Sequence, residues 1–249
     1  MNKHALLLAA ALAATSAQAA GPAKVDFDNG MQGWYGDSAA SGAYYGIDHS
    51  MGDGSTGYHA ISPGLGYVLK NDSNPFFVGD YTGMKSFSFS MDITVNKLTN
   101  GNADGWPMTQ ELVLELRDYD KPGGEMPYSS VWIVMGMIGG YQPVNQHFAV
   151  TIPDSSSNLL PAGWHGNGDF NEWGEPTLPY GQTLRRVLSD VDQVVISTYR
   201  PGFLYGTEQW YDVTVDNIAL SAVPEPEQYT MLAAGLGLLG FTARRRQRK

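Results

Sequence analysis

The residues best suited to chemistry gather in one short segment, which runs from Trp164 to Trp173. This segment holds two tryptophans, one phenylalanine, two asparagines and two acids, separated by glycines. Indole faces stack on the apolar C–H side of sugar rings, while carboxylates and amides exchange hydrogen bonds with hydroxyl groups. We therefore predict a glycan-binding loop, with Trp164, Glu172 and Trp173 as the residues that contact the sugar. Trp173 is the better of the two tryptophans because it lies nearer the middle of the loop.

The same region offers an alternative, because Asp169, Glu172 and Glu175 lie close to the tryptophans. Two carboxylates beside aromatic side chains are what a glycosidase uses. Acids in a loop rich in glycine and asparagine, however, more often do no more than keep a turn solvated. The sequence also has no Gly-x-Ser-x-Gly elbow, no His-Glu-x-x-His motif and no cysteine nucleophile, and its five histidines are scattered. We predict a protein that is not an enzyme, with a polysaccharide-modifying enzyme as the alternative.

A candidate calcium loop lies farther towards the N-terminus. Its residues match the ligand and glycine spacing of a calcium-binding loop: Asn100, Asn102, Asp104, Gly105 and Glu111. The first ligand is Asn instead of Asp, Pro107 fills the usual hydrophobic position, and the flanking segments are strands instead of helices. We therefore favour a polar hairpin loop over a metal site in this stretch.

Strands with alternating apolar and polar residues connect these loops. The clearest strand has one apolar face made of Phe87, Phe89, Met91, Ile93 and Val95. Related patterns predict further strands at residues 58–62, 112–116, 131–138, 148–152, 194–199 and 211–220, and one helical turn at 183–188. The inward-facing phase changes near Asp216–Asn217, which predicts a β-bulge. About ten short strands joined by long loops predict an all-β protein, an antiparallel β-sandwich of the jelly-roll type.

The charge of the body narrows the choice of partner. Residues 20–226 carry 24 acids and nine bases, a formal net charge of −15. Such a surface repels the phosphates of nucleic acids and suits divalent cations instead. The chain has no cysteine, so packing must hold the core, with bound metal as a further support.

The first 19 residues have the features of a secretory signal peptide. Lys3 gives a basic start, an apolar core runs from Ala5 to Ala14, and residues 17–19 form a small-x-small cleavage site. The stretch is too short and too rich in alanine for a permanent membrane span. We predict cleavage after Ala19 and export of the protein.

The last residues, 223–249, combine three features in order. Pro224, Glu225 and Pro226 come first, an apolar run of 15 residues follows at 229–243, and the chain closes with a basic cluster. The run is shorter than the about 20 residues of a comfortable membrane helix, and its basic end would stay in the cytoplasm. The segment resembles the PEP-CTERM sorting signal of Gram-negative bacteria, with an ordinary membrane anchor as the alternative.

The resemblance to PEP-CTERM signals implies how the protein is processed. In that family the tail holds the protein transiently in the inner membrane as a hydrophobic sorting helix. A membrane transpeptidase, the exosortase, then cuts near the Pro-Glu-Pro motif, and the body reaches the cell surface or extracellular matrix. The chain is thereby divided into a signal peptide (1–19), a body (20–222) and a sorting signal (223–249), with exosortase as a partner.

The body resembles the laminin IV, or laminin B, module in three places. They are Asn-Pro-Phe-Phe-Val-Gly-Asp at 74–80, Leu-Arg-Arg-Val-Leu-Ser-Asp-Val-Asp at 184–192 with the strand after it, and Val-Asp-Asn-Ile-Ala-Leu at 215–220. The order and spacing fit across residues 66–221, without the cysteine-rich neighbours usual for laminin modules. The resemblance implies a galactose-binding-like jelly roll and transfers no activity. Laminin-like modules pack a tryptophan beneath the 164–173 region, which makes a core position the alternative for Trp164.

Calcium-bearing jelly rolls of this general type imply a metal site. In them, an acid just after the first strand and an aspartate in the last strand share one ion. Asp28 and Asp216 occupy those places here. We therefore predict a structural calcium ion that ties the two ends of the domain together. The alternative is that Asp28 caps a turn and Asp216 bonds to the bulge.

Together these features predict an exported, surface- or matrix-sorted protein without enzymatic activity. We expect it to bind glycan or to be a structural component of the exopolysaccharide or biofilm matrix. Its expected partners are exosortase and extracellular polysaccharide, and nucleic acid is not among them. A passive adhesion or self-association module is a further alternative.

Overall fold

The computed structural model describes residues 23–36, 43–49, 56–140, 144–203 and 208–223. The predicted signal peptide with its cleavage site at Ala19 lies outside these residues. So do Pro224, Glu225, Pro226 and the apolar run that follows them.

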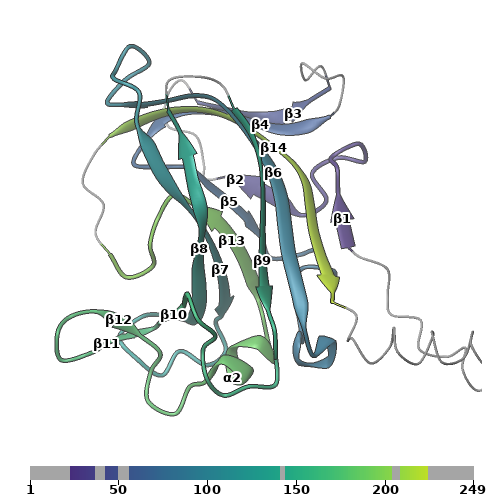
Figure 1. The fold of residues 1–249 in the computed structure, drawn as a ribbon, viewed down its shortest axis with the longest axis vertical. Helices are drawn as coiled ribbons and strands as arrows, with labels where there is room; N and C mark the ends of the chain where they lie inside the picture. The colour runs from purple at the N-terminus through teal and green to yellow at the C-terminus, as the bar shows by residue number, and fades with distance from the viewer. Residues whose placement is uncertain (1–22, 37–42, 50–55, 141–143, 204–207, 224–249) are drawn as a thin grey trace, which may run out of the picture.

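The described residues form two six-stranded antiparallel sheets that pack face to face (Figure 1). The first sheet contains β1 (Ala23–Val25), β3 (Tyr44–Asp48), β4 (Gly57–Gly64), β6 (Phe87–Asn100), β9 (Val144–Ile152) and β14 (Gln209–Ala222). The second contains β2 (Trp34–Gly36), β5 (Val68–Asn71), β7 (Thr109–Asp118), β8 (Ser129–Gly139), β10 (Trp164–Asn167) and β13 (Gln193–Ser197). Outside them lie a hairpin of β11 (Asp169–Phe170) and β12 (Pro176–Thr177) and the short helices η1 (Thr82–Met84) and α2 (Leu184–Leu188).

The order of the strands is that of a jelly roll. Strands β4-β14-β6-β9 of the first sheet face β5-β13-β7-β8 of the second. The chain therefore passes from one sheet to the other at most of its connections, as in the double Greek key of a jelly roll. Strand β1 pairs with β14, while β3 and β9 form the edges of the first sheet, and β10 and β2 those of the second. The predicted antiparallel β-sandwich is confirmed.

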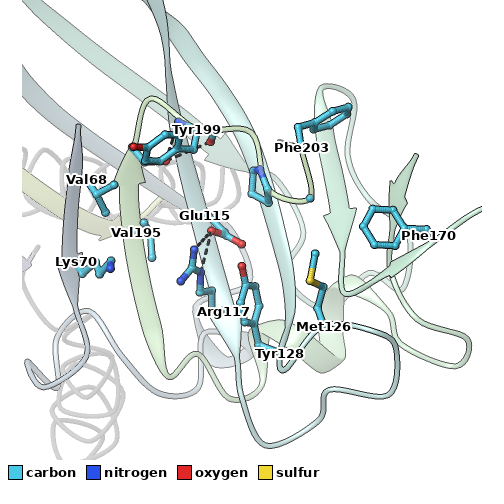
Figure 2. A pocket seen from close by; sticks show the side chains of 13 residues that line it. Val68, Lys70, Glu115, Arg117, Met126, Tyr128, Phe170, Val195, Tyr199 and Phe203 are labelled. Atoms are coloured by element: carbon cyan, nitrogen blue, oxygen red, sulfur yellow. Dashed lines mark hydrogen bonds and ion pairs between the residues drawn. The ribbon is translucent and has the colours of Figure 1, made fainter. Parts of the chain in front are cut away.

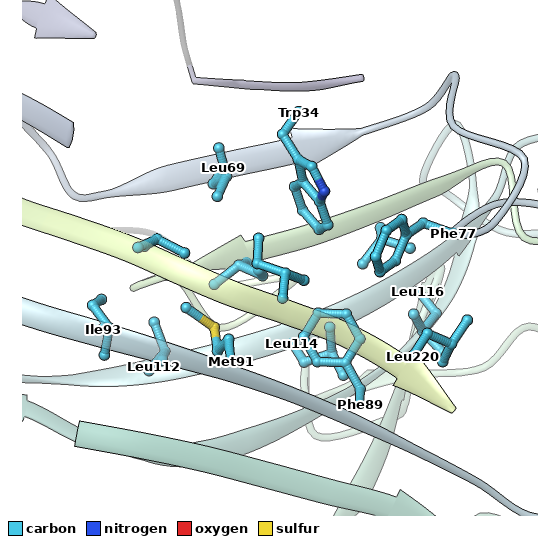
Figure 3. Packing of buried hydrophobic residues seen from close by; sticks show 14 of the residues in the cluster. Trp34, Leu69, Phe77, Phe89, Met91, Ile93, Leu112, Leu114, Leu116 and Leu220 are labelled. Atoms are coloured by element: carbon cyan, nitrogen blue, oxygen red, sulfur yellow. The ribbon is translucent and has the colours of Figure 1, made fainter. Parts of the chain in front are cut away.

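Inward-facing residues of the alternating strands fill the space between the sheets (Figure 3). The buried face of β6 is the predicted one: Phe87, Phe89, Met91, Ile93 and Val95. It packs in one cluster with residues of β7 and β14: Leu112, Leu114, Leu116 and Leu220. Burial of each such side chain stabilises the fold by about 1.5–3 kcal/mol. Because Leu114 and Leu116 face inward, the alternating residues Glu115 and Arg117 face outward from the second sheet.

The β-bulge predicted at Asp216–Asn217 is present in β14. The pairing of β14 with β6 shifts between Asp216 and Ala219, and Asn217 has a left-handed φ of 54°. The buried residues change phase across the bulge: Tyr211, Val213 and Val215 before it, Ile218 and Leu220 after it. Strand β1 pairs with the segment after the bulge, with Val25 opposite Ile218.

The predicted helical turn is also present, as α2. The Thr183 hydroxyl accepts a hydrogen bond from the backbone N–H of Arg186, which is the usual N-cap arrangement. Leu184, Val187 and Leu188 are buried and join the core cluster.

Candidate functional site

The outer face of the second sheet carries an open cleft of about 540 Å³ (Figure 2). Its floor is formed by residues of β5, β7 and β13: Val68, Lys70, Glu115, Arg117, Val195 and Ser197. Its walls come from the segment before β8, from β11 and from the segment after β13: Met126, Tyr128, Phe170, Tyr199, Pro201, Gly202 and Phe203. Apolar and aromatic walls with a few polar groups are typical of ligand sites.

Strand register explains how the floor is assembled. Lys70 of β5 lies opposite Val195 of β13, and Val195 lies opposite Glu115 of β7. The row continues through Trp132 of β8 to His165 of β10. The rings of Trp132 and His165 stack, with their centroids 4.4 Å apart. Directly opposed residues of antiparallel strands point to the same face. Residues far apart in the sequence therefore meet in one row across this face of the sheet.

Glu115 is the charged centre of the floor, with 2% of its surface exposed. Arg117 donates to its Oε2 atom from Nε at 2.8 Å and from Nη2 at 2.6 Å. Ser130 Oγ donates to Oε1 at 2.6 Å. A buried charge persists only when it is paired and hydrogen-bonded. These donors hold Glu115 in one orientation and occupy its acceptor sites.

Tyr128 forms the wall beside this ion pair. The guanidinium carbon of Arg117 lies 4.5 Å from the centroid of its ring, within the range of a cation–π interaction. Burial, followed by the charge of Glu115, raises the pKa of Tyr128 to about 12. The hydroxyl therefore stays protonated at physiological pH and remains a hydrogen-bond donor.

Hydrogen bonds extend this network towards β2. Arg117 Nη1 donates to Gln193 Oε1 at 3.1 Å, and Gln193 Nε2 donates to the Tyr35 hydroxyl at 3.1 Å. Tyr35 in turn donates to Asp72, and burial together with this contact raises the pKa of Tyr35 to about 12. Each polar group of this network is therefore held in place by its neighbour.

The number and surroundings of the acids in the cleft bear on whether it could cut a glycosidic bond. Among the described residues that line the cleft, Glu115 is the only acid. Most glycosidases use two carboxyl groups, one on each side of the bond that they cut. Both oxygens of Glu115 already accept hydrogen bonds, from Arg117 and Ser130, and Tyr128 is protonated at neutral pH. The cleft thus combines aromatic surface with polar groups that are fixed by hydrogen bonds.

The comparisons with known proteins concern first the end of the chain. Residues 222–247 match the PEP-CTERM protein-sorting motif. This match confirms the predicted sorting signal, and the PEP-CTERM motif marks the protein for export and surface sorting. Strand β14 ends at Ala222, so the PEP-CTERM motif begins where the sandwich ends. Within the ranges that the structure describes, no helix is long and apolar enough to cross a membrane.

Solved structures give only distant likenesses, and no curated protein matches the chain. The CBM22-2 xylan-binding domain of Xyn10C from Paenibacillus barcinonensis aligns with a TM-score of 0.43 and 9% identity, over 81% of this chain and 99% of that domain. The CBM22-1 xylan-binding domain of the same protein aligns with a TM-score of 0.38 and 12% identity, over 84% of this chain and 99% of that domain. An exo-beta-agarase aligns with a TM-score of 0.40 and 13% identity, over 81% of this chain and 25% of the enzyme. TM-scores this low carry no conclusion here. The laminin IV resemblance stays a prediction from the sequence.

The wall after β13 is held against the hairpin of β11 and β12. Gly202 has a φ of +79°, and a Cβ atom there would lie 2.5 Å from Cγ of Pro176 and 2.8 Å from Oδ1 of Asn167. Asn167 is fully buried, and neither polar atom of its side chain has a hydrogen-bond partner among the described residues. At the start of the same segment, Arg200 forms a two-point ion pair with Glu111, which lowers the pKa of that acid.

The predicted contact residue Trp164 is part of the core. Its exposed fraction is 5%, and it belongs to the main hydrophobic cluster. An indole packed in this way cannot stack on a sugar, so the prediction of Trp164 as a ligand contact is wrong and the core alternative holds. Trp164 lies in β10 opposite Ile133 of β8, on the face that turns inward.

The other two predicted contact residues are exposed. Trp173, with 79% of its surface exposed, and Glu172 lie in the turn between β11 and β12. The rival catalytic acids, Asp169, Glu172 and Glu175, belong to the same hairpin, and none of them lines the cleft. Glu175 accepts a hydrogen bond from the side chain of Asn171 at 3.1 Å. These acids therefore belong to the hairpin and do not point into the cleft as a group.

The predicted calcium ligands Asp28 and Asp216 lie in different surroundings. Asp28 is exposed in the turn after β1. Asp216 accepts a hydrogen bond from the backbone N–H of Asn217 at 2.6 Å, and burial, followed by the charges of Asp92 and Asp26, raises its pKa. Among the described residues, no group of three or more His, Cys, Asp or Glu side chains is placed to hold a metal ion. The structural calcium ion stays a prediction.

The stretch from Asn100 to Glu111 forms the favoured polar hairpin. Asn100 Oδ1 accepts a hydrogen bond from the backbone N–H of Trp106 at 2.8 Å. Asn102 Oδ1 accepts one from the backbone N–H of Asp104 at 2.9 Å. Glu111 lies in β7, where it pairs with Arg200. The side-chain oxygens of these asparagines are therefore used inside the turn.

Proposed function

We propose that this protein is a non-enzymatic glycan-binding jelly roll that holds polysaccharide in the cleft on the outer face of the second sheet. The observation that carries the proposal is the cleft itself, in which aromatic walls stand over the fixed Glu115–Arg117 pair. Its volume of about 540 Å³ lies within the range of about 300–1,000 Å³ that is usual for ligand pockets.

The chemistry of the walls and floor is that of sugar recognition. Phe170, Tyr199 and Phe203 provide apolar faces for the C–H side of a sugar ring. Lys70 brings an ammonium group to the floor, to which ring hydroxyls can accept hydrogen bonds, whereas the Ser197 hydroxyl is bonded to the backbone of Tyr199. The floor is held by the hydrogen bonds around Glu115, so little conformational entropy is lost on binding.

The charge of the body favours a neutral polysaccharide. Residues 20–226 carry a formal net charge of −15. A field of this sign repels sulfated and phosphorylated polymers, and it does so most strongly at low ionic strength.

The PEP-CTERM motif supports a proposal about location. After export, exosortase removes the tail near Pro224–Pro226 while the protein is transiently held at the inner membrane of a Gram-negative bacterium. The body then reaches the cell surface or the exopolysaccharide matrix, where it acts as a glycan-binding or structural component. A structural calcium ion near Asp216 is part of this proposal, because calcium is available outside the cell.

Affinity electrophoresis of the full-length protein in mild detergent tests the proposal. Gels contain xylan, cellulose derivatives or agarose as neutral polymers, and polygalacturonate as an acidic one. We expect retardation by a neutral polymer, with retardation reduced in Phe203→Ala and unchanged in Tyr180→Ala. Both residues are exposed aromatics, but Tyr180 does not line the cleft. No retardation by any of the polymers, or the same retardation in both variants, would overturn the proposal.

A further inference from the structure

We infer that the ligand is an extended chain of several sugars, which leaves the cleft along the β11–β12 hairpin and stacks on Trp173 at its tip. The inference rests on the proposed function and deepens it. It names the class of ligand: the interior of a polysaccharide, and not a single sugar or a chain end that fits in the cleft alone.

The hairpin connects the cleft to Trp173. Phe170, which lines the cleft, is the last residue of β11 and lies opposite Pro176 of β12. Trp173 follows three residues later, in the turn of the same hairpin. Three residues span at most about 10 Å even when fully extended. The indole is therefore within reach of a chain that passes Phe170.

The turn that presents Trp173 is ordered by Asn171. Its Oδ1 atom accepts hydrogen bonds from the backbone N–H groups of Trp173 and Glu175, each at 2.9 Å. The backbone N–H of Asn171 donates to the Glu175 carbonyl at 3.0 Å, and Gly174, with a φ of +75°, closes the turn by donating to the Asn171 carbonyl. An indole on a turn held in this way loses little freedom when a sugar stacks on it.

Exposure of Trp173 has no explanation in the packing of the sandwich. Trp34, Trp132 and Trp164 are buried, whereas 79% of the surface of Trp173 is exposed. A single exposed aromatic residue is common and is not evidence by itself. The evidence is the combination of exposure, an ordered turn and a hairpin whose other aromatic residue, Phe170, lines the cleft.

Trp106 provides a matched control. It is 77% exposed and also lies in an ordered hairpin turn, between β6 and β7. The turn that carries Trp106 comes just before Thr109, and Thr109 pairs with Gly139 at one end of β8. Strand β11 comes just after Asn167, and Asn167 pairs with Ser130 at the other end of β8. The two tryptophans therefore lie near opposite ends of the sheet, and Trp106 is neither in the β11–β12 hairpin nor among the residues that line the cleft.

The test is the dependence of affinity on chain length. Dissociation constants of the full-length protein in mild detergent are measured by calorimetry for oligosaccharides of xylan, cellulose and agarose, from the disaccharide to the hexasaccharide. We expect the wild type to gain affinity with length. Trp173→Ala should keep the wild-type constant for the shortest bound sugar and lose about tenfold for the hexasaccharide, about 1.4 kcal/mol. Trp106→Ala should match the wild type at every length.

The failures are distinguishable. If Trp173→Ala equals the wild type for the hexasaccharide, while Phe203→Ala still weakens binding, the chain does not reach Trp173 and only this inference falls. An equal loss at every length would also overturn it, because Trp173 would then contact the first sugar. If the wild type binds none of these sugars or their polymers, the proposed function falls and this inference falls with it.

Discussion

Arg117 holds Glu115 on the floor of the cleft through two hydrogen bonds, of 2.8 and 2.6 Å, to the same carboxylate oxygen. Both residues come from β7, two positions apart, and face outward because Leu114 and Leu116 face the core. The pair is largely shielded from water, since Glu115 is almost fully covered. A charge in this setting depends on its partner for its stability.

Arg117→Met should destabilise the protein strongly, because it leaves the buried Glu115 carboxylate without its cation. Removal of one partner of a buried ion pair costs about 3–5 kcal/mol. The double variant Glu115→Gln with Arg117→Met removes both charges and should recover most of that loss. Denaturant unfolding of the three proteins measures this difference. Equal unfolding free energies for the single and double variants would mean that Glu115 is not electrostatically dependent on Arg117.

Gly202→Ala should disturb the cleft wall. The substitution places a Cβ atom in contact with Pro176 and Asn167 and forces alanine into a left-handed backbone conformation. Gly101→Ala is the control, because Gly101 has a similar φ of +74° but no heavy atom within 4 Å of the added Cβ. We expect a loss of about 1 kcal/mol for Gly101→Ala, from the backbone alone. Gly202→Ala should lose more and should also weaken glycan retention. Equal stability losses and unchanged retention in both variants would show that the contact with Pro176 does not shape the wall.

Asp216→Asn should raise the melting temperature at pH 7 in the presence of a chelator. Burial raises the pKa of Asp216 in the folded protein, so the folded state binds the proton more tightly than the unfolded state does. The contribution of Asp216 to the stability of the fold is therefore most favourable at a pH below its pKa in the unfolded state. That contribution is lost as the pH rises through its raised pKa in the folded state. Asparagine keeps the oxygen that accepts from Asn217 and removes the charge. Because solvent screens this group, we expect a rise of only about 1 °C, which should vanish near pH 3.

Calcium should act differently on the melting temperatures of the wild type and of the Asp216 variants. If the ion binds at Asp216, as predicted, calcium at about 0.1–1 mM should stabilise the wild type and leave Asp216→Ala and Asp216→Asn unchanged. Identical melting curves of the wild type in chelator and in calcium would exclude the site.

The tail should be absent from the mature protein. The chain matches the PEP-CTERM motif at residues 222–247, and we predict a cut near Pro224–Pro226. Mass spectrometry of the protein recovered from the surface of its native host should therefore show a C-terminus between residues 223 and 226. Recovery of a surface protein that still carries Arg244–Lys249 would contradict processing by exosortase.

Much of the fold followed from alternation along the chain. The apolar residues of Phe87–Val95 and the phase change at Asp216–Asn217 predicted a core face and a bulge that the structure has. Local patterns of this kind are sufficient because one buried face determines the direction of each side chain in a strand. Short strands such as β2, β11 and β12 have too few residues for a pattern, and only their pairing partners define them.

The cleft was not predictable in the same way. Its floor combines Lys70, Glu115 and Val195, which become neighbours only when β5, β13 and β7 pair in register. The one local signal was Glu115-Leu-Arg117, two opposite charges on the outward face of a strong strand, and its meaning depended on burial by the walls. Trp164 and Trp173 look alike in the sequence, yet the pairing of β10 with β8 buries Trp164 in the core, whereas the hairpin turn exposes Trp173.

The most direct measurement is the affinity of a cleft double variant, Phe170→Ala with Phe203→Ala, for the neutral polysaccharide that retains the wild type. Both rings line the cleft from different segments, and Phe203 is 43% exposed, so its loss should not disturb the core. Two lost stacking contacts of about 1.4 kcal/mol each predict an approximately 100-fold higher dissociation constant with an unchanged melting temperature. The same dissociation constant in the wild type and the folded double variant would contradict binding in this cleft.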